Sequence, residues 1–205
     1  MNRMKRFGGT CAISLAGFVM MGAVVAAGDT LQVKDGEVSV ICPLTVGGSF
    51  EAKTDEVKGQ VTVARENEPL AGALHVDLQS LETGIGLRDR HMKNNYLEVE
   101  KGAEYAAARL EEIRVQKLAG KTTFSGFLTL HGARKQVTGT AEIKPTQSGY
   151  RVEASFPLRT AEFGIPEPTY LGVGVKDEVQ VRVNFTAARS AVATVARAAG
   201  SHGSR

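Results

Sequence analysis

The feature that most constrains the fold of this chain is a period-two alternation of apolar and polar residues. In residues 57–63, valines and a glycine alternate with polar side chains, and residues 177–186 repeat the pattern with valine and phenylalanine. Similar segments recur between glycine-rich turns from residue 30 to residue 186, and almost no stretch has a helical period. This pattern predicts an all-β fold of about eight antiparallel strands, arranged as a barrel or a sandwich.

Three local irregularities are expected within the alternation. Asp35-Gly36 is typical of a turn between two short strands, and Asp55-Glu56 is typical of a hairpin turn between the next two. In residues 105–118 the apolar face changes at Glu111-Glu112, which predicts a β-bulge. These positions decide which side chains point into the interior.

One stretch, residues 81–110, departs from the alternation. It contains the densest charged and polar cluster of the chain, between Arg88 and Asn95. Asp89 and Lys93 are four residues apart, as on one face of a helix. The spacing predicts a short helical segment near residues 87–96, docked by its apolar residues onto one end of the β-structure.

This cluster has two interpretations. In the functional one, Arg88, Arg90, His91 or Lys93 holds an anionic head group at the entrance of a cavity. In the structural one, Arg88 and Asp89 tie the helix to neighbouring strands and the other charges are solvated. Both interpretations stay open at this point.

The N-terminus has the composition of a secretory signal peptide. Three basic residues precede an apolar run over residues 7–25, and Val25-Ala26-Ala27 is a small-residue cleavage site. We therefore expect a signal peptide over residues 1–27, and the alternative is an uncleaved anchor. One domain is expected over 28–187, followed by a flexible tail over 188–205 that is rich in alanine, glycine and serine.

The charge balance argues against a nucleic-acid partner. The chain has 25 basic and 22 acidic residues, but three of the basic residues lie in the expected signal peptide, which contains no acid. The mature chain is therefore close to neutral, and a binding face for phosphate backbones has no electrostatic support.

Catalytic and metal-binding patterns are not found. The chain has neither a nucleophile elbow nor a phosphate-binding loop, and its four histidines are not paired at metal-ligand spacing. Cys11 leaves with the signal peptide, so Cys42 remains alone in an apolar strand, where we expect it to be buried and inert. We expect no enzyme, no cofactor and no metal.

The inward-facing rows contain small residues, including Gly59, Gly126, Gly139, Ala141 and Ala154. A barrel of about eight strands is just wide enough to be filled by side chains or to hold one ligand. Small inward residues favour a cavity. The alternative is that the glycines mark bends and bulges that close the barrel.

Four stretches of the sequence, taken together, resemble the YceI-like family of periplasmic polyisoprenoid-binding proteins. They are residues 46–59, the cluster Arg88-Asp89-Arg90-His91-Met92 with Tyr96, Leu97 and Tyr105 beyond it, residues 126–138, and residues 163–185. They cover most of residues 30–187 in the order of the family. Two departures, Ala106 and Gln136, stand where many members have proline.

The resemblance implies a lipocalin-like antiparallel barrel in the periplasm, with an isoprenoid lipid or similar amphiphile in an apolar tunnel. The inward residues expected to form the tunnel wall are Val61, Val63, Leu74, Val76, Leu78, Phe124, Leu128, Val152, Phe156, Val181 and Val183. The polar residues expected at its mouth are Arg88, Asp89, His91 and Tyr170.

The expected function is therefore to bind such a lipid for transport, storage or sequestration. Two alternatives are an enzyme that acts on an isoprenoid or quinone-like lipid and a filled barrel that serves as a stress or interaction protein. A homodimer and transient contact with a membrane or a membrane protein are compatible with the chain. The sequence does not select the lipid.

Overall fold

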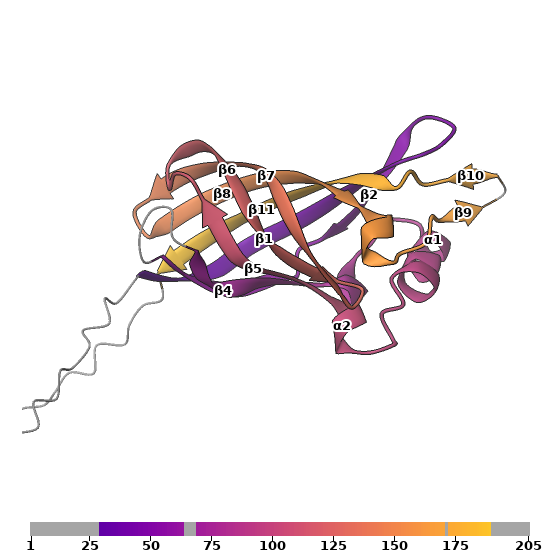
Figure 1. Ribbon diagram of the computed structural model, residues 1–205, viewed down its shortest axis with the longest axis horizontal. Coiled ribbons are helices and arrows are strands. Elements are labelled where there is room, and N and C mark those ends of the chain that lie inside the picture. Colours follow the sequence, from indigo (N-terminus) through magenta and orange to yellow (C-terminus); the bar gives the residue numbers. More distant parts are fainter. Residues whose placement is uncertain (1–28, 64–68, 171, 190–205) are drawn as a thin grey trace, which may run out of the picture.

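The computed structural model describes residues 29–63, 69–170 and 172–189, and its main element is a closed antiparallel barrel (Figure 1). Eight strands form the ring in this order: β1 (Asp29–Pro43), β3 (Val57–Val63), β4 (Leu70–Asp77), β5 (Ala107–Val115), β6 (Gly120–Leu130), β7 (Ala133–Thr146), β8 (Gly149–Arg159) and β11 (Glu178–Arg189). Strand β11 returns to pair with β1 and closes the ring. The predicted eight-stranded barrel is confirmed.

The expected turn at Asp35-Gly36 is wrong, because β1 is one continuous strand through this position. Asp35 has a φ of 50°, and the register with β11 shifts between Lys34 and Glu37, as at a β-bulge. A Cβ atom on Gly36 would lie 2.5 Å from the Cβ of Val57, so the close approach of β3 requires glycine here. Residues that favour turns also favour bulges, which explains the error.

The expected hairpin at Asp55-Glu56 is also wrong. Strand β2 (Ser49–Thr54) and strand β3 both pair antiparallel with β1, one after the other and in the same register. They form one interrupted strand beside β1. The true hairpin turn lies between β1 and β2, where the N–H of Leu44 donates to the carbonyl of Gly48 at 2.9 Å.

The predicted bulge in β5 is confirmed. Its register with β6 shifts between Glu111 and Arg114, and Glu112 has a φ of 50°. The bulge lets both Leu110 and Ile113 contribute to the apolar interior.

The shorter elements gather at one end of the barrel (Figure 1). The predicted helical segment is confirmed there as α1 (Gly86–His91), which continues into a π-helical turn, η2 (Met92–Tyr96). The remaining elements are η1 (Leu78–Ser80), α2 (Ala103–Ala106), η3 (Thr160–Phe163), β9 (Thr169–Tyr170) and β10 (Val173–Gly174).

The opposite end of the barrel is filled by side chains. Leu31, at 2% exposure, is its most buried large residue, and Phe124 packs edge-on against Phe156 with ring centroids 5.8 Å apart. A Cβ atom on Gly139 would lie 2.7 Å from the ring of Phe124, so this inward glycine makes room for an aromatic side chain. Gly139 therefore does not create a cavity, because neighbouring atoms of Ser155, Phe124 and Phe156 occupy its space.

Both ends of the described chain lie at this filled end. The guanidinium of Arg189 contacts the carboxylate of Asp29 at 3.0 Å, and Arg189 pairs with Leu31. Strand β11 thus continues two residues beyond the predicted domain boundary at 187, while the predicted signal peptide and the rest of the tail lie outside the described residues. No helix in the described part of the chain is long and apolar enough to cross a membrane.

Candidate functional site

An apolar cavity of about 630 Å³ occupies the half of the barrel opposite the filled end. This volume lies in the range of roughly 300–1,000 Å³ that is typical of small-molecule sites. The alternation of the strands produces the lining, because every second residue points inward. On β1, for example, Val38, Val40 and Cys42 line the cavity after the bulge has shifted the inward face.

The mouth of the cavity is formed by three segments at the end where the short elements gather (Figure 1). They are the turn between β1 and β2, the helical segment α1–η2, and the stretch from Ile165 to Val175 that contains β9 and β10. The first and third segments are tied together, since the N–H of Thr45 donates to the carbonyl of Gly174 at 2.9 Å and the N–H of Gly174 donates to Oγ1 of Thr45 at 2.9 Å.

Adjacent residues on α1 face different surroundings. Arg88 lines the cavity, and its guanidinium carbon lies 4.3 Å from the centroid of the Phe50 ring. Asp89 turns away from the cavity and accepts hydrogen bonds from the backbone N–H and the hydroxyl of Thr83, at 2.7 and 2.6 Å. Asp89 therefore holds the helix in place, and Arg88 is presented to the cavity.

A second set of polar contacts, made by His131, holds the chain just after the helical segment α1–η2. The half-buried His131, in the turn between β6 and β7, contacts the carbonyl of Phe163 through Nδ1 at 3.1 Å and the carboxylate of Glu98 through Nε2 at 3.0 Å. The ammonium of Lys101, 2.6 Å from the same carboxylate, lowers the pKa of Glu98, and His131 contributes further. The histidine thus joins two segments that frame the mouth.

Comparison with known proteins gives this barrel its family. A model of the YceI-like domain matches residues 23–187, which is most of the chain. The chain belongs to the YceI-like family. No curated protein matches it.

Several solved structures have the same fold as this YceI-like chain. BcnA from Burkholderia cenocepacia is 16% identical, with a TM-score of 0.58 over 73% of this chain and 94% of that one. A polyisoprenoid-binding domain from Saccharophagus degradans, implicated in plant cell wall breakdown, is 15% identical, with a TM-score of 0.56 over 80% and 99%. The YCEI protein of Campylobacter jejuni is 13% identical, with a TM-score of 0.51 over 70% and 87%. At these identities the likeness is one of fold.

The predicted wall residues of the YceI-like barrel divide into two groups. Those that line the cavity are Leu74, Val76, Leu78, Leu128, Phe156, Val181 and Val183. Those that do not line it are Val61, Val63, Phe124 and Val152, which pack in the apolar core at the filled end. All of them belong to the apolar interior, but their place along the barrel axis decides whether they meet the cavity.

The predicted mouth residues divide in a similar way. Arg88 and His91 line the cavity, whereas Asp89 does not. Tyr170 lies on β9, but its side chain is outside the described residues. Within the described residues, no group of three acidic, histidine or cysteine side chains is arranged to hold a metal ion.

Several lining residues were missed by the sequence prediction. Ile85 and Leu87 are exposed at 50% and 53% beside the mouth, and Ile165 and Val175 lie at the two ends of the stretch that contains β9 and β10. Apolar residues in a segment rich in glycine and proline were the available signal, since a solvated loop has no need of them.

Cys42 is expected to react very slowly with alkylating agents. Burial raises the pKa of its thiol to about 11, although the positive charge of Arg88 lowers it in part. Because only the thiolate reacts, the rate with iodoacetamide should rise about tenfold per pH unit from pH 7 to pH 10. Alkylation of native protein, with urea-unfolded protein as the control, tests this. A plateau near pH 8.5, as for an exposed thiol, would contradict it.

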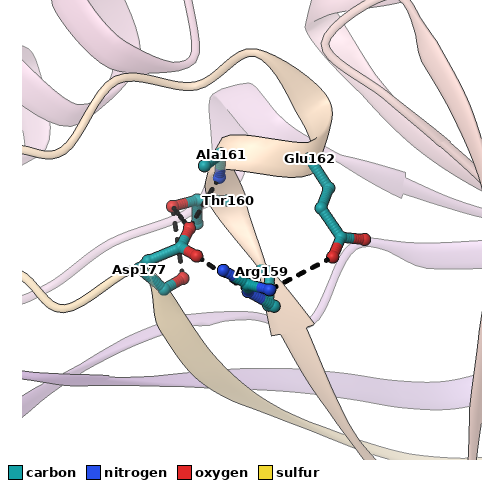
Figure 2. A network of polar contacts seen from close by, with 5 residues as sticks. All are labelled: Arg159, Thr160, Ala161, Glu162 and Asp177. Carbon is teal, nitrogen blue, oxygen red and sulfur yellow. Dashed lines mark hydrogen bonds and ion pairs between the residues drawn. The ribbon is translucent and has the colours of Figure 1, made fainter.

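Figure 2 shows a polar network that fixes the stretch leading to the mouth. Asp177, just before β11, accepts hydrogen bonds from the N–H of Ala161 at 2.7 Å, from Nε of Arg159 at 2.9 Å and from the hydroxyl of Thr160 at 3.2 Å. The bond from Ala161 is the main cause of the lowered pKa of the Asp177 carboxyl, with further contributions from Arg159 and Thr160. The carboxylate thereby caps η3 from a distant segment.

Replacing this carboxylate should weaken the protein in a pH-dependent way. A folded-state pKa below the unfolded value of about 3.9 stabilises the fold above that pH, and the contribution is lost as the pH falls through the folded-state pKa. Asp177→Asn should lower the Tm by about 2–4 °C at neutral pH, the effect of losing about 1 kcal/mol. Thermal unfolding of both proteins from pH 7 to pH 2 measures this.

The matched control is Glu162→Gln, because Glu162 contacts Arg159 only at 3.8 Å on the surface. We expect no measurable change in that variant. An equal Tm difference between wild type and Asp177→Asn at both ends of the pH range would show that the charge of Asp177 is not the cause.

Proposed function

We propose that this YceI-like protein is an exported carrier that holds a long isoprenoid lipid or similar amphiphile inside its barrel. The observation behind the proposal is the cavity of about 630 Å³, which is lined almost entirely by apolar side chains and has its mouth at the β1–β2 turn, α1–η2 and the stretch that contains β9 and β10. An isoprenoid chain needs an elongated apolar enclosure, and its head group needs a few polar residues at the opening.

Two further observations support this proposal. A domain of the same fold from Saccharophagus degradans is described as polyisoprenoid-binding. The N-terminal residues have the composition of a signal peptide, so we place the protein in the periplasm, where it would transport, store or sequester the lipid without a cofactor. Brief contact with a membrane would then suffice for loading, and a dimer is compatible with this role.

The alternatives have less support. A barrel filled by side chains does not account for the cavity. An enzyme would need a pair of titratable groups matched to proton transfer within the cavity. The described lining contains Arg88, His91 and Cys42 as its ionisable groups, apart from the phenol of Tyr96, and the high pKa of the Cys42 thiol makes it a poor nucleophile.

Native mass spectrometry provides the test. The full chain is expressed in a bacterial host, and the protein is purified from the periplasm and weighed before and after organic extraction. We expect a stoichiometric adduct that fragments as an isoprenoid, or uptake of an offered polyprenol by the extracted protein. A clean apo mass with no uptake of the polyprenol would overturn the carrier proposal, and absence of the protein from the periplasm would overturn the location.

A further inference from the structure

The cavity has an unbalanced charge at its mouth. Among the described residues that line it, Arg88 is the only one that is a lysine, arginine, aspartate or glutamate. It is half-buried and contacts the face of Phe50, and no carboxylate of the described residues forms an ion pair with it. The Phe50 ring stabilises this half-buried guanidinium in part, and an anionic ligand would add the counter-charge that the described residues do not supply.

The nearest candidate for a counter-charge is otherwise engaged. Asp89, the next residue, directs Oδ1 to the backbone N–H and the hydroxyl of Thr83 on the side away from the cavity. Arg88 and the Cys42 thiol line the same cavity, and the positive charge of Arg88 lowers the pKa of that thiol in part, against the larger effect of burial. The mouth is therefore electropositive toward any ligand that enters.

We infer that the site selects amphiphiles with an anionic head group, a phosphate or a carboxylate, which is held by the Arg88 guanidinium while the apolar chain fills the cavity. This inference rests on the proposed lipid-binding function. The planar guanidinium presents parallel N–H donors that match two oxygens of an oxyanion, and such charge-assisted bonds are about twice as strong as neutral ones. A neutral alcohol, amide or quinone head group could accept a hydrogen bond from Arg88 but would supply no counter-charge.

Two probes with the same chain isolate the head group. Farnesyl phosphate and farnesol are titrated against protein freed of bound lipid, with displacement of a fluorescent fatty probe as the readout. We expect wild type to bind farnesyl phosphate about 10- to 100-fold more tightly than farnesol. Arg88→Gln should abolish this preference and change the affinity for farnesol by less than about threefold, while Arg88→Lys should restore part of it.

The matched control is Arg90→Gln. Arg90 is an exposed cation on the same helix and does not line the cavity, so its removal should leave the preference unchanged. An equal loss in Arg90→Gln and Arg88→Gln would indicate general attraction by the positive helix and overturn the inference. Thermal unfolding of each variant shows whether the fold is retained. If Arg88→Gln does not fold, Arg88→Lys provides the test, because it keeps the charge but lacks the planar guanidinium, so the preference for farnesyl phosphate should fall without being lost.

The remaining outcomes separate the two proposals. Equal affinity of wild type for both probes, or a preference that survives in Arg88→Gln, overturns the anionic head group but leaves the carrier proposal in place. Binding of neither probe overturns both. Inorganic phosphate should compete only at concentrations at least about 100-fold higher than farnesyl phosphate, since it lacks the chain. Competition at equal concentration would indicate a site for free anions and overturn the inference.

Discussion

Ala108→Phe should strongly reduce lipid uptake while leaving the barrel stable. Ala108 lies on β5, opposite Val76 of β4, and its side chain faces the open cavity. A phenyl ring at this position would occupy space that the ligand needs, and it would do so without displacing packed side chains. We expect at least about tenfold weaker binding of a polyprenol, or about 1.4 kcal/mol. Native mass spectrometry measures the loss of uptake, and urea unfolding measures the stability.

The control is the same substitution in the filled half of the barrel. Ala187 on β11 is also an inward alanine, but it is 3% exposed, packs in the apolar core and does not line the cavity. Ala187→Phe should reduce the free energy of unfolding by about 1–3 kcal/mol, the usual cost of overpacking, and should impair uptake only through loss of folded protein. Equal destabilisation by the two substitutions would mean that the half around Ala108 is packed and that the cavity is absent in solution.

The contrast between these two alanines shows what sequence could and could not predict. Period-two alternation identifies inward residues strand by strand, and the barrel and the bulge at Glu112 followed from it, whereas the helical segment followed from the four-residue spacing of Asp89 and Lys93. Alternation gives no position along the barrel axis. That position depends on strand tilt and register, which are set by pairing between segments far apart in the chain. For this reason Val61 and Val181 appeared equivalent although only Val181 meets the cavity.

Local turn signals were the less reliable part of the prediction. Asp35-Gly36 and Asp55-Glu56 both have turn composition, yet neither reverses the chain. Asp35-Gly36 lies within β1, and Asp55-Glu56 lies between β2 and β3, which pair with β1 in the same register. The choice between a turn and a bulge is made by the long-range partner, since β1 needs its full length to pair with β11 on one side and with β2 and β3 on the other. At the mouth, Arg88 and Asp89 could not be separated by spacing alone, because Thr83 determines which of them turns away.

Phe156→Ala should cause the largest loss of stability among the substitutions considered. Phe156 is 5% exposed, lines the inner end of the cavity and packs edge-on against Phe124, with an interplanar angle of 87°. Its removal deletes a buried ring and extends the cavity toward the filled end, at a cost of about 3–5 kcal/mol in the free energy of unfolding. Urea unfolding of the extracted, lipid-free protein measures this cost.

The same variant also tests where the cavity ends. If Phe156 separates the cavity from the filled half, its removal should lengthen the cavity and raise the affinity for longer isoprenoid chains relative to shorter ones. The control is Phe127→Ala, because Phe127 lies on the outer face of β6 with the guanidinium carbon of Arg134 4.0 Å from its ring centroid. Because Phe127 is half-buried, loss of its ring should cost only about 1–2 kcal/mol, and it should leave chain-length preference unchanged. A cost for Phe156→Ala as small as that for Phe127→Ala, with no change in chain-length preference, would place the end of the cavity elsewhere.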